Sequence, residues 1–276
     1  MFTLNCKGKL IIIDKPLIMG ILNINNDSFY AGSRFQNLDA ISNKVDQMIA
    51  EGADIIDIGG QSTRPGSERI SAEEELKRVM PVFEMLSKKS HDILLSIDTY
   101  DSIVAKETVD AGAAIVNDIS AGEIDKNMLE TVAALGVPFI AMHMNGVPET
   151  MHQSIKYENV VTEVLDFFIN RISQCRNAGI ADVIIDPGFG FGKTIHHSFQ
   201  ILKSLEIFKM LGKPVLAGIS RKSTIYKTLQ ITAEDALNGT TVMNTIALLN
   251  GANILRVHDV KEAKEAVTLL QAYGKA

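Results

Sequence analysis

One pattern recurs along the chain and limits the folds open to it: a glycine followed by a short apolar run that ends on a polar residue. Its six copies begin at Gly52, Gly112, Gly136, Gly179, Gly212 and Gly251. A glycine just past a helix can cap it, because glycine reaches positive φ without a Cβ clash. The runs are rich in Ile and Val with little alternation, which is typical of strands buried on both faces of a parallel sheet. Residues 17–23 and 92–99 match without the glycine, so the sequence predicts eight such strands.

The segments between these strands show helical spacing of apolar residues, as at Val161, Val164 and Phe168. Eight buried parallel strands that alternate with helices predict a (β/α)₈ barrel, the TIM barrel, with a doubly wound open sheet as the alternative. Residues 1 to about 15 precede the first barrel strand and are expected to form a short β-hairpin over the barrel floor. No linker or low-complexity tract divides the chain, so residues 1–276 are interpreted as a single domain.

The composition is that of an ordinary soluble globular chain, with 46% hydrophobic and 22% charged residues. A net charge of −6 lacks the basic excess of nucleic-acid-binding surfaces, so any anionic ligand must meet local cations. The two cysteines, Cys6 and Cys175, are too far apart in sequence for a metal or redox motif and suit a reducing compartment. No apolar run resembles a signal-peptide core or approaches the roughly 20 residues of a membrane span. We therefore expect a cytoplasmic protein without nucleic-acid or membrane partners.

Residues 186–194, DPGFGFGKT, end like a Walker phosphate-binding loop, whose pattern is GxxxxGK[ST]. The opening glycine of that pattern must fall at position 187, which is Pro187. Proline has no N–H to offer a phosphate and fixes its own φ at about −65°. The nucleotide-binding interpretation is therefore disfavoured, and the glycines must serve another purpose.

Polar residues stand where the predicted strands end, which in a (β/α)₈ barrel is the side of the active site. Asp98, Asn117 and Asp186 each close an apolar run, so we expect them in the deep wall of one mouth, where buried carboxylates need partners. Such a set supplies mostly acceptors and suits a planar ligand rich in N–H donors, such as an aminopyrimidine. Each residue alone could equally cap a neighbouring loop, but three together favour a site.

Basic residues follow the seventh and eighth strands, the corner where barrels commonly bind phosphate. Arg221 and Lys222 lie in the stretch SRKS, and Arg256 and His258 alternate along the last strand and so share a face. Arg and Lys are natural phosphate ligands, although a solvated charge cluster is the alternative. Lys222 could also act as a Schiff-base nucleophile if burial depressed its pKa, but a neighbouring Asp186 would keep it protonated.

The remaining histidines carry less information. His143 ends the fifth strand and is ambiguous, whereas the others stand in polar contexts without carboxylates at metal spacing and are expected at the surface: His91, His152, His196 and His197. No HExxH or related signature occurs, so a protein-built zinc site is disfavoured. Glycines around DSFYAGS and STRPGS predict long loops after the first two strands that act as lids.

Motifs spread from residue 19 to residue 260 resemble one known family, the dihydropteroate synthases of folate biosynthesis. In chain order they read MGILNINNDSF, GADIIDIGGQSTRPGS, SIDT, IVNDIS, AMHMNGVPETM, DPGFGFGKT, GISRKS and LRVHDV. The resemblance covers nearly the whole chain. It implies a transferase that joins 6-hydroxymethyl-7,8-dihydropterin diphosphate to 4-aminobenzoate and releases diphosphate and 7,8-dihydropteroate. It also implies bound Mg²⁺ and a homodimer.

The site residues of that family carry over onto matching positions of this sequence. By resemblance, the pterin contacts are Asp98, Asn117, Met142, Asp186, Lys222 and Arg256. The diphosphate contacts are Thr63, Arg256 and His258, and Asn23 helps to hold Mg²⁺. The 4-aminobenzoate pocket comprises Phe29, Arg64, Pro65, Phe191 and Ser223. The residues implied in catalysis, which needs no protein nucleophile, are Asp186, Lys222, Arg256 and His258.

Two loops depart from the family pattern. The first usually reads close to NVTPDSFSDGG, whereas here Asn25 and Asn26 replace Thr-Pro, and Tyr30 and Ala31 replace Ser-Asp. The second has Gln61 where Glu is usual, so each loop lacks a negative charge. Two alternatives stay open: a pterin-dependent methyltransferase, which SRKS and STRPG disfavour, and a non-catalytic pterin-binding barrel.

Overall fold

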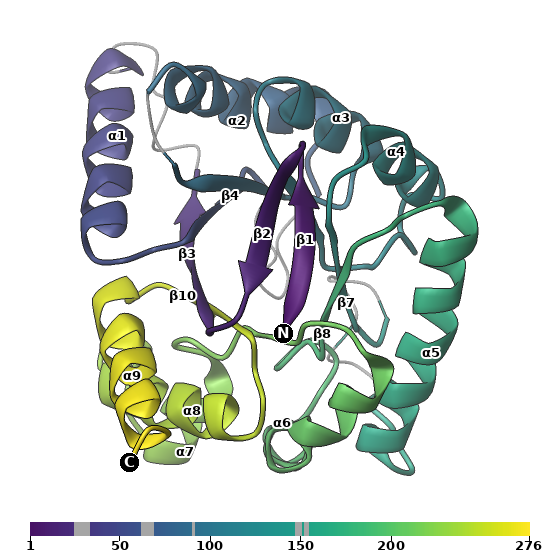
Figure 1. Cartoon of the computed structure of the whole chain (residues 1–276), viewed down its shortest axis with the longest axis vertical. Helices are drawn as coiled ribbons and strands as arrows, with labels where there is room; N and C mark the ends of the chain where they lie inside the picture. Colours follow the sequence, from purple (N-terminus) through teal and green to yellow (C-terminus); the bar gives the residue numbers. More distant parts are fainter. Residues whose placement is uncertain (25–33, 62–68, 90–91, 147–150, 152–154) are drawn as a thin grey trace.

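The chain forms a barrel of parallel strands (Figure 1). The computed structural model describes residues 1–276 except 25–33, 62–68, 90–91, 147–150 and 152–154. The eight strands of the sheet are β3 (Leu17–Asn23), β4 (Ile55–Gly59), β5 (Leu94–Asp98), β6 (Ile115–Asp118), β7 (Phe139–Met142), β8 (Val183–Asp186), β9 (Leu216–Ala217) and β10 (Ile254–Val257). They pair in the order β8-β7-β6-β5-β4-β3-β10-β9, and a parallel bridge between Ile185 and Val215 joins the two edges. The predicted (β/α)₈ barrel is therefore confirmed, and the open sheet is excluded.

Helices surround the barrel (Figure 1). They are α1 (Arg34–Ala50), α2 (Ala72–Ser87), α3 (Ser102–Asp110), α4 (Met128–Leu135), α5 (Val160–Ala178), α6 (Ile195–Lys203), the 3₁₀ helix η2 (Leu205–Leu211), α7 (Ser223–Leu229), α8 (Leu237–Leu249) and α9 (Val260–Tyr273). Two helices, α7 and α8, stand between β9 and β10, where the repeating pattern predicts one. The chain turns between them at Gln230, whose φ is +57°. Within the described ranges, no helix is long and apolar enough to cross a membrane.

The repeated glycines do what the pattern predicts. All six have positive φ, between +62° and +125°, and Gly136, Gly179 and Gly212 form left-handed caps on α4, α5 and η2. The strands that follow these three glycines, β7, β8 and β9, are buried at every position. Their apolar residues share one core with the inward faces of the helices. The glycine therefore ends each helix and lets the chain turn into a strand that the helices then cover.

The expected N-terminal hairpin is also confirmed. Strands β1 (Phe2–Cys6) and β2 (Lys9–Ile13) pair in antiparallel fashion, and Figure 1 shows them lying across the barrel. Leu4, Cys6 and Ile13 form a second buried cluster with residues near the beginnings of the barrel strands, such as Leu17 and Ile254. The hairpin therefore covers the floor of the barrel and leaves the carboxyl ends of the strands for a site.

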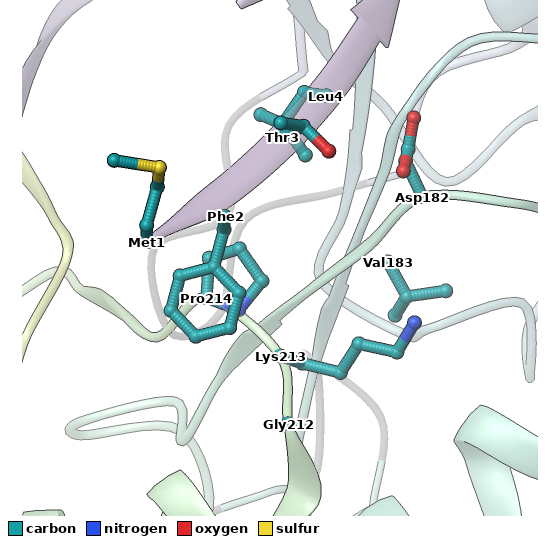
Figure 2. A pocket seen from close by; sticks show the side chains of 9 residues that line it. All are labelled: Met1, Phe2, Thr3, Leu4, Asp182, Val183, Gly212, Lys213 and Pro214. Atoms are coloured by element: carbon teal, nitrogen blue, oxygen red, sulfur yellow. The ribbon is translucent and has the colours of Figure 1, made fainter. Parts of the chain in front are cut away.

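A cavity of about 350 Å³ lies at this floor, between the hairpin and the barrel (Figure 2). Its lining includes Phe2, Pro214, Asp182 and Lys213. Oδ2 of Asp182 already accepts the backbone N–H of Asn5 at 2.7 Å, so this carboxylate fastens the hairpin to the barrel. The cavity lies between the hairpin and the barrel, at the opposite end from the polar residues that close the strands. Its position therefore gives no reason to propose an active site there.

Candidate active site

A buried ion-pair network joins the last barrel strand to two others. Arg256 of β10 donates from Nε to Oδ2 of Asp57 in β4 and from Nη2 to Oδ2 of Asp98 in β5, each at 2.6 Å. Asp57 is fully buried and Asp98 is 7% exposed. Burial raises the pKa of Asp98 to about 7, although the positive charge of Arg256 opposes the rise. One guanidinium thus pairs with two carboxylates. The carboxyl-terminal end of the barrel, called the mouth below, therefore has more acceptor oxygens than this one cation can neutralise.

Asp57 organises this network, although the sequence analysis did not select it. Its Oδ2 also accepts Nδ2 of Asn117, at the 2.9 Å expected of a good hydrogen bond. Among the residues that the structure describes, none forms a hydrogen bond with Oδ1 of Asp57. The contact with Asp57 holds the Asn117 amide in one orientation at the end of β6. The sequence does contain a signal for Asp57, because a carboxylate inside the apolar run IIDIG is unusual. Asp57 lies in the middle of the strand, whereas the prediction covered only strand ends.

Three predicted site residues from different strands converge around Gly218, just after β9. A Cβ built on Gly218 would lie 3.7 Å from Oδ2 of Asp186, 3.8 Å from Nζ of Lys222 and 3.9 Å from Cβ of Arg256. The first and last of these belong to β8 and β10, and Lys222 follows β9. The structure therefore brings an acidic and two basic side chains to the rim of one small space.

Asp186 and Lys222 each favour the charged form of the other in this buried setting. Burial raises the pKa of Asp186, and the positive charge of Lys222 opposes this rise. Burial lowers the pKa of Lys222 to about 8, and the carboxylate of Asp186 opposes this fall. Nζ of Lys222 donates to the backbone carbonyl of Phe189 at 2.7 Å and lies 4.6 Å from the ring centroid of Phe191. A lysine held in this way is a hydrogen-bond donor rather than a free amine nucleophile.

His258 lies just beyond β10, beside the loop that follows β9. Its Nδ1 is 3.1 Å from Oγ of Ser220, and its backbone N–H donates to the same oxygen at 3.2 Å. Partial burial and then the charge of Arg256 lower the pKa of His258 to about 4. The ring is therefore neutral at pH 7 in the protein without ligand, and Ser220 fixes its position.

Arg221 does not belong to the cation cluster that the stretch SRKS suggested. Its guanidinium forms a two-armed ion pair with Asp259, with Nε at 2.9 Å and Nη2 at 2.8 Å from the carboxylate oxygens. Nη1 donates to the carbonyls of Ala233 and Glu234. Arg221 therefore joins the loop after β9 to the start of α9 and to the segment before α8, which is a structural role.

Apolar and small polar side chains complete the described part of the mouth. Met142 is 3% exposed and shares a buried cluster with Ile119 and Tyr100, against which Phe191 packs. Ser223 is the first residue of α7, next to Lys222. Asn23 ends β3, and its Oδ1 lies 3.8 Å from the place that a Cβ on Gly59 would take.

Several predicted residues lie outside the described part of the chain. These are Phe29, Thr63, Arg64 and Pro65, the loop departures Asn25, Asn26, Tyr30 and Ala31, and the histidines His91 and His152. Gln61, at the edge of the second loop, is described: its Oε1 accepts the backbone N–H of Ile70 at 2.9 Å. A carboxylate oxygen could accept the same bond, so replacing the usual Glu keeps this link between the two ends of the loop.

The remaining histidines divide between the surface and the interior. His196 is exposed, as expected. His197 is half-buried and completes a capping box with Thr194 at the start of α6, so it has a local structural role that the surface prediction missed. His143 is 7% exposed, and its Nδ1 lies 2.8 Å from Nζ of Lys193. The lysine of the sequence Gly-Lys-Thr therefore faces protein groups and not a nucleotide site.

A closed (β/α)₈ barrel whose mouth holds this set of acceptors and cations fits the class of pterin-binding enzymes, and the model of the family described as "Pterin binding enzyme" matches residues 19–258. The chain is 42% identical over 275 residues to the dihydropteroate synthase of Haemophilus influenzae, covering 99% of each protein. The chain belongs to the dihydropteroate synthase family, a family of transferases. The match to relatives of this name does not favour the methyltransferase alternative.

Solved structures agree with this assignment. The dihydropteroate synthase of Xanthomonas albilineans with 4-aminobenzoic acid superposes with a TM-score of 0.91 at 39% identity, covering 99% of this chain and 98% of that one. The structure of the same enzyme in complex with 7,8-dihydropteroate gives a TM-score of 0.86 at 36% identity, covering 99% of both chains. The barrel and its strand order are therefore those of this family.

Proposed function

We propose that the chain joins 6-hydroxymethyl-7,8-dihydropterin diphosphate to 4-aminobenzoate, releasing diphosphate and forming 7,8-dihydropteroate. The observation that carries the proposal is the convergence of Asp98, Asn117 and Asp186 with Arg256 and Lys222 at one end of the barrel. The related enzyme of Xanthomonas albilineans is described with 4-aminobenzoic acid and with 7,8-dihydropteroate, which supports the same two ligands here.

The pterin ring fits the acceptor-rich wall. An aminopyrimidine edge presents several N–H donors, and Asp98, Asn117 and Asp186 offer oxygens from β5, β6 and β8 to receive them. Lys222, held protonated by Asp186, would donate to the ring carbonyl. Met142 and Arg256 would pack against the ring. Because hydrogen bonds to charged groups contribute about 1.5–3 kcal/mol each, this set accounts for selection of a pterin over an apolar ring.

The diphosphate would lie beside the last strand. Arg256 uses Nε and Nη2 for Asp57 and Asp98, so Nη1 would be the nitrogen that donates to the phosphate. His258, neutral and oriented by Ser220, would donate a hydrogen bond rather than a charge. Thr63 would complete the set from the second loop. These donors would stabilise the negative charge that accumulates on the departing diphosphate, usually the largest catalytic contribution of such a site.

The second substrate needs little chemical activation. As the C–O bond to diphosphate breaks, positive charge develops on the pterin methylene carbon, and the carboxylates of the mouth are placed to stabilise it. The amine of 4-aminobenzoate then forms the C–N bond, and the resulting ammonium gives one proton to solvent. Phe29, Arg64, Pro65, Phe191 and Ser223 would hold this substrate in line, and positioning alone can supply a large part of the rate.

A magnesium ion fits the oxygen donors at this end of the barrel. Asn23 closes β3, and a Cβ on Gly59 would lie within 4 Å of both Asn23 and Asp98. Mg²⁺ commonly takes one or two protein oxygens and completes its shell with substrate phosphates and water. When bound, it would supply positive charge opposite the leaving group.

Asn23→Ala should therefore raise the Mg²⁺ concentration that gives half-maximal rate, by about tenfold if one net ligand contact of about 1.4 kcal/mol is lost. A magnesium titration of the initial rate measures this shift. An unchanged half-maximal concentration would remove Asn23 from the metal site.

The exposed face of α8 supports a homodimer. Val242, Ile246 and Leu249 lie one turn apart and are 51%, 37% and 57% exposed, and Leu229 at the end of the adjacent α7 is 51% exposed. Apolar residues at this helical spacing form a stripe that a second copy would cover. Sedimentation equilibrium should give twice the chain mass, and Val242→Glu together with Ile246→Glu should give the monomer. A wild-type monomer would contradict the proposal.

Both cysteines support a cytoplasmic location. Cys6 and Cys175 are buried free thiols, and burial raises the pKa of each, to about 12 and about 11. Thiols of this kind resist oxidation and suit a reducing compartment. Cell fractionation would test this, and recovery in a secreted fraction would contradict it.

The function itself is tested by diphosphate release from purified protein given dihydropterin diphosphate and Mg²⁺. We expect release that depends on 4-aminobenzoate, together with formation of 7,8-dihydropteroate. Binding of the pterin substrate without release would instead identify a non-catalytic pterin-binding barrel.

A further inference from the structure

Lys193 is a buried lysine that the proposed site does not use. It is 4% exposed, and Nζ lies 2.8 Å from Nδ1 of His143, 3.1 Å from the backbone carbonyl of His143 and 3.0 Å from the backbone carbonyl of Phe191. Burial lowers the pKa of Lys193 well below its usual value, and the negative charge of Asp186 opposes this fall. Three acceptors match the three N–H donors of its protonated form. The side chain therefore joins the end of β7 to the loop that follows β8.

His143 is the fixed end of this bridge. Its backbone N–H donates to the carbonyl of Asp186 at 2.9 Å, which continues the pairing of β7 with β8. Its ring lies edge-on to Phe167, with centroids 4.8 Å apart. Burial and then the charge of Lys193 lower the pKa of His143 to about 2, so the ring is neutral and its Nδ1 can accept an N–H of Lys193. The residue is thus held by strand pairing, ring packing and Lys193 together.

The loop after β8 lies very close to the segment after β7. Gly188 and Gly192 have φ values of +70° and +61°, and a Cβ on either would clash with the backbone carbonyl of His143 or of Asn145 respectively. Such close approach of two backbones requires glycine. This close approach lets Nζ of Lys193 donate to the carbonyls of both His143 and Phe191. Lys193 therefore fixes the distance between the two segments.

The segment that Lys193 holds carries the ring of Phe191. This ring is 4.6 Å from Nζ of Lys222, which also bonds the carbonyl of Phe189, so residues 189–191 are held between two lysines. By contrast, Asp98 and Asn117 are attached to Arg256 and Asp57 and do not depend on this loop.

The geometry points to Lys193 as a positioning residue for the second substrate: it sets the place of Phe191 and so the 4-aminobenzoate subsite, while the pterin contacts Asp98 and Asn117 are fixed independently of it. This rests on the proposed function. Gly188, Gly192 and Lys193, which resemble part of a nucleotide-binding loop, then share one role. They hold the loop that carries Phe191 against the end of β7.

The first test is Lys193→Met, which keeps the length of the side chain and removes its donors. We expect the KM for 4-aminobenzoate to rise about tenfold, the size expected for one or two lost net hydrogen bonds. The KM for dihydropterin diphosphate should stay within about twofold of its wild-type value. Val82→Ala, a core truncation in α2, which packs against α1 and α3, is the matched control: it should lower Tm without moving either KM.

A second pair of variants decides the matter if Lys193→Met does not fold. His143→Asn and His143→Leu both lose the ring contact with Phe167, but the Asn Oδ1 stands near the position of Nδ1 and keeps an acceptor for Lys193. We expect His143→Asn to retain the low KM for 4-aminobenzoate and His143→Leu to raise it.

Equal rises in the two KM values of Lys193→Met, no change in either, or identical behaviour of the two His143 variants would overturn the assignment. A wild-type protein that does not consume 4-aminobenzoate would count against the proposed function instead. An active wild type with an unaltered Lys193→Met would count against the positioning role alone.

Discussion

Asp186→Asn should lower kcat about a hundredfold while leaving Tm nearly unchanged. The substitution keeps the size of the side chain but removes the charge that faces Lys222 and offers the ligand an N–H where it needs an acceptor. Loss of a hydrogen bond to a charged group costs about 1.5–3 kcal/mol, and about 1.4 kcal/mol is a factor of ten. Stability should change little, because burial already raises the pKa of this carboxyl and so opposes its charged form. Steady-state kinetics and thermal unfolding measure the two effects.

Asp118→Asn is the matched control for this experiment. Asp118 is also a fully buried carboxylate at a strand end, but its oxygens accept from the backbone N–H groups of Ser120 and Gly122 and from the Ser120 hydroxyl, all within its own loop. Because both oxygens of Asp118 accept hydrogen bonds, the NH₂ group of an asparagine there must face a backbone N–H donor. Tm should therefore fall, while kcat and the KM values stay unchanged. Wild-type kinetics for Asp186→Asn would remove Asp186 from the site.

Arg256→Ala should destabilise the fold as well as the site. The substitution leaves Asp57 and Asp98 buried without their shared cation, and breaking a buried pair in this way costs about 3–5 kcal/mol. Binding of dihydropterin diphosphate should also be lost, because phosphate and pterin contacts fail together. Urea denaturation and calorimetric titration measure the two losses.

The pH dependence of the Arg256→Ala deficit has a definite sign. Asp98 has a folded pKa of about 7, above the ordinary 3.8, so its burial costs stability that sets in as pH rises above 3.8 and is complete above the folded pKa. Removing Arg256 raises that pKa further. The stability gap to wild type should therefore be widest near pH 8 and narrow toward pH 4, where the carboxyl binds a proton in both variants.

Arg221→Ala supplies the comparison, because Arg221 forms a close ion pair with Asp259 that includes none of the proposed ligand contacts. It should lose stability and keep pterin binding. If Arg256→Ala lowers the free energy of unfolding by less than about 1 kcal/mol, the network contributes no more than an exposed ion pair does. That result would contradict the stabilising role given to Arg256.

The barrel was predictable because its signal repeats. The barrel strands are buried at nearly every position, so their sequences are mostly apolar runs. The helix before six of the strands is followed by a glycine, because the chain needs a positive φ there, as at Gly136 and Gly179. Polar residues at the strand ends then meet because parallel strands present their carboxyl ends on one side. This rule alone predicts that Asp98, Asn117 and Asp186 lie at the same end of the barrel.

What the sequence did not predict depends on pairing between distant side chains. Arg221 and Lys222 are adjacent, yet a left-handed φ of +53° at Arg221 sends one toward Asp259 and the other to Asp186. Asp57 matters because Arg256, 199 residues away, reaches it. No local pattern records such contacts. The split of the last helical segment into α7 and α8 likewise depends on one turn at Gln230.

The most direct test of the whole account is a crystal structure of the protein with dihydropterin diphosphate. We predict the pterin ring against Asp98, Asn117 and Asp186, with its diphosphate toward Arg256 and His258. A ligand bound at the barrel floor beside the hairpin, or at any place that leaves these side chains untouched, would contradict it.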